Sequence, residues 1–188
     1  MKRFLGALAA VAGVAILAGA GPARASVTVI GGGLAEACSK AALAGLSDRR
    51  DEYSCTQALD TELLSPRDKA GTFVNRGIMK LRRGEMDSAL KDFNVAARFE
   101  PSLGEIYVNR GAALIGEHKY SDGLADLNHG LALGVEEPAK AYYNRALAYE
   151  GLDDVKSAYF DYQKAVELSP DWDAPKQQLT RFHVTRRE

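Results

Sequence analysis

Apolar residues in this chain recur at the three- and four-residue spacing of amphipathic helices, and glycine or proline separates the segments. Ser65 and Pro66 have the residue types of a helix N-cap and first turn, and Gly84 ends the same segment. The pattern predicts an all-α fold. The expected helices cover residues 34–45, 48–63, 65–83, 86–99, 103–116, 121–133, 137–149, 153–168 and 171–184.

The tripeptide Asn-Arg-Gly recurs within this helical region. It begins at Asn75, begins again 34 residues later at Asn109, and returns after a further 35 residues as Asn-Arg-Ala from Asn144. A period near 34 residues is typical of helical hairpins that stack on one another. Small residues recur where the two helices of a hairpin must touch, and large residues alternate with them. The small positions are Gly77, Gly111, Ala146, Ala89, Gly123, Ala158, Ala96, Gly130 and Ala165, and the large ones are Phe73, Tyr107, Tyr142, Phe93, Leu127 and Tyr162.

These small, aromatic and terminal proline positions resemble those of the tetratricopeptide repeat (TPR) family, and several agree in three successive units. The resemblance covers residues 70–170 and implies a solenoid of helical hairpins. Two departures are Lys80, where an aromatic residue is usual, and Pro138, which implies one extra residue in the preceding loop. The layout is also similar to that of small exported Gram-negative TPR proteins. The expected divisions are a degenerate first hairpin at 34–64, repeats at 65–103, 104–138 and 139–172, and a capping helix at 173–188.

TPR proteins usually bind a peptide or partner protein in a concave groove lined by the first helix of each unit, so the resemblance implies such a groove here. Its three asparagines form a ladder, and a carboxamide can both donate to and accept from the main chain of an extended segment. In the alternative interpretation, each asparagine bonds a carbonyl of a neighbouring helix and only fixes the stacking. The expected groove residues are Val74, Asn75, Ile78, Arg82, Val108, Asn109, Ala112, Ile115, Tyr143, Asn144, Leu147 and Glu150.

Each arginine of the tripeptide is followed 16 residues later by an aspartate. Because the pair recurs at one level of every unit, we expect each guanidinium to reach an aspartate on the second helix of its own or the preceding unit. Such a ladder would fix the stacking angle. Anion binding in the groove is the functional alternative. The pairs are Arg76 with Asp92, Arg110 with Asp126, and Arg145 with Asp161.

The N-terminus has the features of a secretory signal peptide. Two basic residues precede an apolar run from Phe4 to Ala20, and Ala23-Arg24-Ala25 has the small residues that a signal peptidase requires. We expect a signal peptide at 1–25, cleavage after Ala25 and export to the periplasm. A membrane anchor is the alternative, although the run is rich in Ala and Gly. Residues 26–33 are short and Gly-rich, and we expect them to form a flexible leader.

Cys38 and Cys55 are the two cysteines of the chain. They lie equally far along the sequence from the midpoint of the turn between the first two expected helices, which places both at one level of an antiparallel hairpin. In an exported protein this arrangement predicts a disulfide. The alternative is a redox-active or metal-binding pair, but the Cys-x-x-Cys spacing that lowers a thiol pKa is missing.

Charge and residue types argue against several functions. Removal of residues 1–25 leaves 21 basic against 25 acidic residues, a net charge of −4, which disfavours nucleic-acid binding. No spacing of histidines, cysteines or serines suggests a metal, a cofactor or an enzyme. The sequence therefore predicts a non-enzymatic protein-protein interaction module whose processed chain is not inserted in a membrane. The alternatives are a structural subunit of an envelope complex, a self-oligomerising scaffold, or an accessory to periplasmic redox or maturation chemistry.

Overall fold

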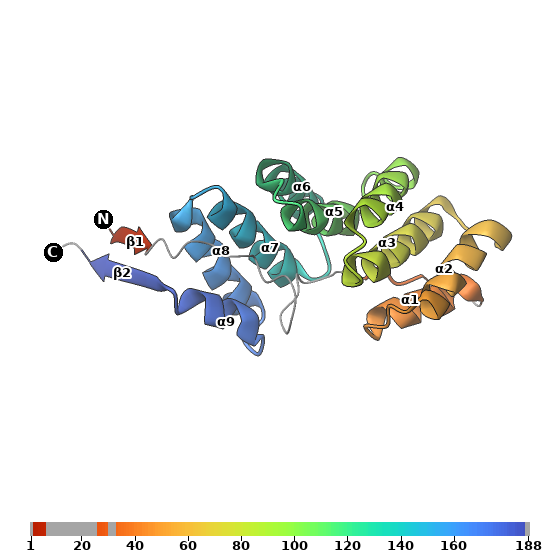
Figure 1. The fold of residues 1–188 in the computed structure, drawn as a ribbon, viewed down its shortest axis with the longest axis horizontal. Helices are drawn as coiled ribbons and strands as arrows, with labels where there is room; N and C mark the ends of the chain where they lie inside the picture. Colours follow the sequence, from red (N-terminus) through yellow and green to blue (C-terminus); the bar gives the residue numbers. More distant parts are fainter. Residues whose placement is uncertain (1, 7–25, 30–32, 187–188) are drawn as a thin grey trace.

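The structure, a computed structural model of the 188-residue chain, describes residues 2–6, 26–29 and 33–186. The predicted signal peptide lies outside the described residues except for 2–6, and residues 30–32 of the predicted leader also lie outside them. Nine helices lie in the described part of the chain (Figure 1). They are α1 (Leu34–Leu43), α2 (Arg49–Thr61), α3 (Pro66–Arg82), α4 (Met86–Phe99), α5 (Gly104–Gly116), α6 (Tyr120–Leu133), α7 (Pro138–Gly151), α8 (Val155–Leu168) and α9 (Asp173–Leu179).

The first eight helices pair into four hairpins, which follow one another along the long axis of the molecule (Figure 1). Within each hairpin the odd-numbered helix packs against the next helix, and each hairpin also contacts the one that follows. The odd-numbered helices α1, α3, α5 and α7 contact each other in succession and form one layer, called here the inner layer. The predicted all-α solenoid is confirmed, and the bounds of α1 to α8 match those expected to within a few residues.

Local sequence explains where several helices begin and how the hairpins turn. The Ser65 hydroxyl accepts from the Asp68 N–H at the start of α3, and Asp48 forms a capping box at the start of α2. The turn inside each repeat contains one residue of positive φ, which is 77° at Gly84, 60° at His118 and 60° at Asp153. These three residues are 34 and 35 positions apart, so the backbone of the turn repeats even though its residue type does not.

Close contact between helices explains the small residue of the tripeptide. A Cβ atom on Gly111 would lie 2.9 Å from the carbonyl oxygen of Gly123, so a larger residue would force α5 and α6 apart. In the last repeat the same two positions are Ala146 and Ala158, and both are fully buried. Large side chains fill the space beside them, including Phe93 in α4, which is also fully buried. The alternation of small and large residues is therefore a packing requirement.

The two ends of the chain differ from what the sequence predicts. Residues 26–29 of the predicted leader form neither helix nor strand, and Val27 and Val29 are buried. The capping helix α9 ends at Leu179 instead of continuing to 184, and strand β2 (Phe182–Arg186) follows it. β2 pairs antiparallel with β1 (Lys2–Gly6). Aromatic and β-branched residues favour the extended conformation of β2, and Phe182 packs against the rings of Tyr159 and Tyr162.

The predicted disulfide joins the first two helices. Cys38 of α1 and Cys55 of α2 are bonded, with their Cα atoms 4.8 Å apart, and both are fully buried. Sδ of Met79 on α3 lies 3.8 Å from Sγ of Cys55, so the bond also contacts the next hairpin. The disulfide therefore closes the first hairpin at the surface where it meets the first repeat.

Removal of this disulfide should destabilise the protein. The bond closes a short loop in the unfolded chain, and we expect the double substitution Cys38→Ala, Cys55→Ala to lower the free energy of unfolding by about 3 kcal/mol. Urea denaturation measures this difference, and reduction of the unsubstituted protein should give a similar loss. Two free thiols in the exported protein, titrated under denaturing conditions, would contradict the disulfide.

Candidate functional site

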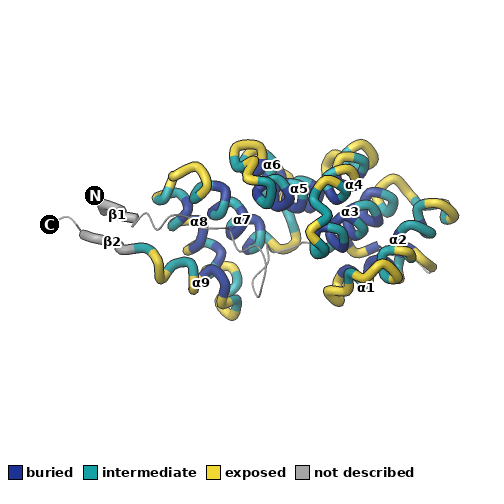
Figure 2. The backbone as a smooth tube through the Cα atoms, in the orientation of Figure 1, coloured by how far each residue is buried: buried dark blue, intermediate teal, exposed yellow. Residues whose placement is uncertain are grey.

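The twelve groove residues expected from the sequence lie on α3, α5 and α7 of the inner layer. The structure places nine of them in the interior and three at half-buried positions, and Figure 2 shows the burial of these helices. The buried ones are Val74, Asn75, Ile78, Val108, Asn109, Ala112, Ile115, Tyr143 and Asn144, and the half-buried ones are Arg82, Leu147 and Glu150. Their use by a partner stays a prediction.

Asn75 on α3 holds the main chain of the N-terminal extended segment. Its Nδ2 donates to the carbonyl oxygen of Val27 at 2.8 Å, and its Oδ1 accepts from the Val27 N–H at 3.1 Å. Asn75 is fully buried, and Val27 is 7% exposed. One carboxamide therefore satisfies both main-chain polar groups of a single residue, whatever the side chain of that residue is.

Residues 26–29, called here the N-terminal segment, lie between α1 and α3. Ser39 of α1 donates from Oγ to the same Val27 carbonyl at 3.0 Å and accepts from the Val29 N–H at 3.3 Å. Gly71 of α3 leaves room for the segment, because a Cβ atom there would lie 2.8 Å from Cγ1 of Val27. Sequence reasoning missed this contact. The alternation Val-Thr-Val was the available signal, but it is too short to predict an extended segment by itself.

The other two asparagines of the ladder have different surroundings. Asn109 on α5 donates from Nδ2 to the carbonyl oxygen of Glu105 at 2.8 Å, four residues earlier in its own helix. Asn144 on α7 is fully buried. Asn75 thus holds main chain, as the first interpretation expects, whereas the Asn109 bond to a carbonyl of its own helix is predicted by neither interpretation.

The two charged residues of the expected groove bond to other parts of the protein. Nη1 of Arg82 donates to the carbonyl oxygen of Leu46 at 3.1 Å, and burial lowers the pKa of Arg82. Glu150 accepts from the Tyr162 hydroxyl at 2.7 Å and forms an ion pair with Arg181. Burial raises the pKa of Tyr162 well above its ordinary value. These charges fix neighbouring turns and helices.

The arginines of the tripeptide form three equivalent ion pairs, each within its own hairpin. Every guanidinium donates two bonds to one carboxylate through Nε and Nη2, which is the bidentate geometry. The Nε and Nη2 distances are 2.9 and 2.7 Å for Arg76 with Asp92, 2.7 and 2.7 Å for Arg110 with Asp126, and 2.7 and 2.9 Å for Arg145 with Asp161. The hydrogen bond to Asp126 is the main cause of the raised pKa of Arg110, ahead of the opposing effect of burial.

The same guanidinium groups reach the preceding hairpin, through residues that sequence reasoning did not identify. Nη1 of each arginine donates to a polar side chain on the second helix of that hairpin, and an aromatic ring lies about five ångströms away. The acceptors are Thr56 at 3.2 Å for Arg76, Asn94 at 2.9 Å for Arg110 and Asn128 at 2.8 Å for Arg145. The rings are Phe73 at 5.2 Å, Tyr107 at 5.3 Å and Tyr142 at 5.1 Å. Each set is called here an arginine node, and the predicted pairing of each arginine with its aspartate is confirmed.

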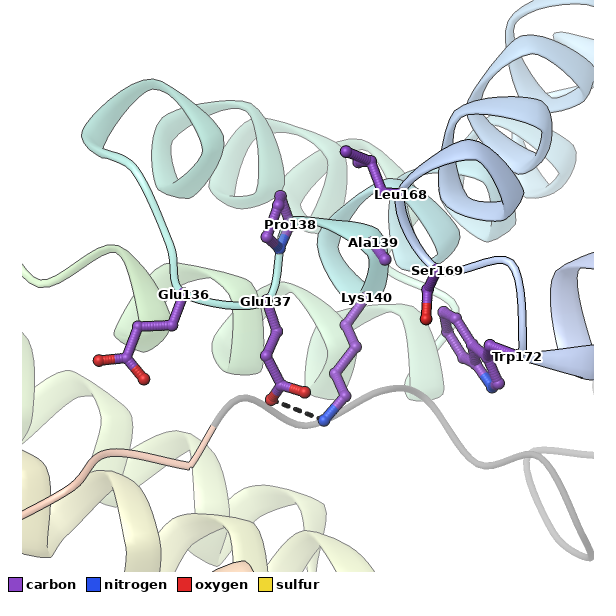
Figure 3. A pocket seen from close by; sticks show the side chains of 8 residues that line it. All are labelled: Glu136, Glu137, Pro138, Ala139, Lys140, Leu168, Ser169 and Trp172. Atoms are coloured by element: carbon purple, nitrogen blue, oxygen red, sulfur yellow. Dashed lines mark hydrogen bonds and ion pairs between the residues drawn. The ribbon is translucent and has the colours of Figure 1, made fainter.

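Two clefts lie beside the inner layer. A cleft of about 310 Å³ separates the start of α7 from the segment after α8, and Figure 3 shows Trp172 there, with Lys140 paired to Glu137. A second cleft of about 360 Å³ lies between the N-terminal segment, the start of α5 and the segment after α6. The residues that the structure describes contain no cluster of three or more metal-ligating side chains. None of the helices in the described ranges is long and apolar enough to span a bilayer.

Comparisons with known proteins agree with this geometry. A family model described as tetratricopeptide repeat matches residues 139–171. The Hsp70-Hsp90 organizing protein of Triticum aestivum is 35% identical over 95 residues, which are 50% of this chain and 16% of that protein. This chain therefore matches only a small part of that relative.

Solved structures share the fold. The second TPR domain of human RPAP3, solved in complex with the HSP70 peptide SGPTIEEVD, has a TM-score of 0.56 at 20% identity and covers 62% of this chain and 96% of that one. MamA of Desulfovibrio magneticus has a TM-score of 0.61 at 23% identity and covers 79% of this chain and 82% of that one. The family model thus matches one repeat of the chain, and these neighbours share its fold.

The arginine nodes should contribute measurably to stability. We expect Arg110→Lys to lower the free energy of unfolding by roughly 1–3 kcal/mol, because lysine keeps the charge but loses the bidentate fork and the bond to Asn94. Arg98→Lys on the exposed surface of α4 is the control and should change it by less than about 0.5 kcal/mol. Urea denaturation measures both variants, and equal effects would contradict a role for the node in stability.

Proposed function

We propose that this chain is a non-enzymatic interaction module that binds an extended segment of a partner protein or peptide along α5 and α7. The observation that carries the proposal is the Asn75 carboxamide, which bonds both the N–H and the carbonyl of Val27. This geometry recognises main chain rather than a side chain. The N-terminal segment is thus an internal example of the kind of ligand that we propose.

The repeat supplies the same chemistry at two further positions. Asn109 and Asn144 occupy the place of Asn75 in α5 and α7. Asn109 now donates to a carbonyl of its own helix, and exchanging that bond for one to a partner carbonyl would cost little, because a net hydrogen bond is worth about 1 kcal/mol. We therefore expect the partner segment to continue along the inner layer beyond the site that Val27 occupies.

Charge narrows the class of partner. The HSP70 peptide bound by the RPAP3 domain ends in acidic residues, and recognition of such an end requires accessible cations. In this chain Arg82 donates to the Leu46 carbonyl, and Lys140 is paired with Glu137. We infer that the partner segment is uncharged and rich in β-branched apolar residues, like the segment that contains Val27 and Val29.

The proposed location is the periplasm of a Gram-negative cell. Residues 1–25 have the charge, apolar run and small residues of a signal peptide, and the proposed cut after Ala25 leaves Ser26 as the first residue. The Cys38–Cys55 disulfide supports an oxidising compartment.

A peptide-binding experiment tests the function. The probe is a fluorescent peptide with the sequence of residues 26–31, and its affinity for the exported protein is measured by anisotropy. We expect the double substitution Asn109→Ala, Asn144→Ala to weaken binding by at least about tenfold. It removes the hydrogen bonds from the two carboxamides to the main chain of the peptide, each of which is worth about 1 kcal/mol.

The control is Gln177→Ala, which removes an exposed carboxamide from α9 and should leave the affinity unchanged. Thermal unfolding of each variant separates binding from stability. Unchanged affinity together with a lowered melting temperature would favour the alternative in which the asparagines only fix the stacking.

A further inference from the structure

Glu105 is a buried acid that the repeat does not explain. It lies in the first turn of α5 and is 5% exposed. The equivalent positions in the neighbouring repeats are Gly71 and Lys140, so no shared packing rule requires a carboxylate there. Its Oε1 accepts from the Glu136 N–H at 3.0 Å, and Glu105 forms no ion pair with any residue that the structure describes. A buried carboxylate is costly without a cation, so this one indicates an additional partner.

Glu105 faces the cleft that contains the N-terminal segment. Ser26, Glu105 and Glu136 all line this cleft of about 360 Å³, and Arg67 lines it as well. The position of Ser26 is constrained because the next residue, Val27, is bonded to α3 and α1. Two glutamates and one arginine therefore line the cleft beside Ser26, an excess of one negative charge.

We propose that Glu105 is the counter-ion of the α-ammonium group that signal-peptide removal creates at Ser26. The inference rests on the proposed cut after Ala25. Hydrolysis of that amide adds water across the bond, gives the carboxyl group to Ala25 and leaves an amine on Ser26, which takes up a proton near neutral pH. The same nitrogen changes from a neutral amide with one donor to a cation with three.

This ion pair would make the attachment of the N-terminal segment to the inner layer depend on removal of the signal peptide. Within the described part of the chain, the hydrogen bonds that hold Val27 to Asn75 and Ser39 are neutral. After cleavage, the ammonium group at the end of the same segment pairs with Glu105, so the segment is attached to α5 as well as to α1 and α3. The processed protein thus has a first repeat whose inner face is occupied by its own N-terminus.

Selective removal of the amine tests the pair. The full chain is exported from a Gram-negative host, and the first residue of the purified protein is checked by intact mass. Mild periodate then converts an N-terminal serine to an aldehyde and releases its nitrogen as ammonia. Melting temperature is measured before and after treatment for the unsubstituted protein, for Glu105→Gln, and for the control Glu137→Gln, which removes a carboxylate outside the cleft.

We expect treatment to lower the melting temperature by about 3 °C in the unsubstituted protein and in Glu137→Gln, and to have no effect in Glu105→Gln. Equal losses in all three proteins, or no loss in the unsubstituted one, would overturn the inference. A first residue other than Ser26 would overturn it together with the cut site. None of these outcomes bears on the peptide-binding experiment, which tests the asparagines of α5 and α7.

A second measurement needs no substitution. The pKa of the Ser26 amine is obtained by NMR of the processed protein. Glu105 and Glu136 favour the charged ammonium form of this amine, and Arg67 opposes it. A pKa above the ordinary range of about 7.7–8.0 supports the pair. A value within or below that range contradicts it.

Discussion

The arginine node is the interaction on which the arrangement of the repeats depends. A single guanidinium such as that of Arg110 holds Asp126 in its own hairpin, reaches Asn94 in the preceding one and lies against the ring of Tyr107. Its planar fork accepts only a narrow range of positions for these partners. The node therefore sets the separation of two helices and the angle between two hairpins at once. Because it recurs in three successive units, the stacking geometry recurs with it.

Consecutive residues on a helix point about 100° apart, so fixing the arginine also fixes its neighbours. Asn109 precedes Arg110, and Gly111 follows it, where the backbone of α5 approaches Gly123. The close approach of Gly111 to Gly123 fixes the rotation of α5 about its axis. Asn109, which lies on the opposite side of α5, is therefore oriented by the same contact. This explains how three asparagines keep one register along the inner layer although Asn75 and Asn109 bond different groups.

The sequence predicts the parts of the structure that depend on local or repeated patterns. The helices, the pairing of Arg76 with Asp92 and the Cys38–Cys55 bond all follow from spacings within one or two helices. The N-terminal segment could not be predicted in this way, because Val27 is held by Asn75, 48 residues away. The acceptors Asn94 and Asn128 were missed for a related reason, since their role depends on contact between hairpins.

The two ends of the solenoid are held by different physical means. A terminal hairpin lacks one neighbour and would expose an apolar face. At the start, the disulfide contacts Met79 of α3, and the N-terminal segment lies between α1 and α3, so both join the first hairpin to the first repeat. At the end, α9 and the rings of Trp172 and Phe182 pack against Tyr143 and Tyr162 of the last repeat. Asn109 on α5 and Asn144 on α7 lie between these two ends, and both are fully buried.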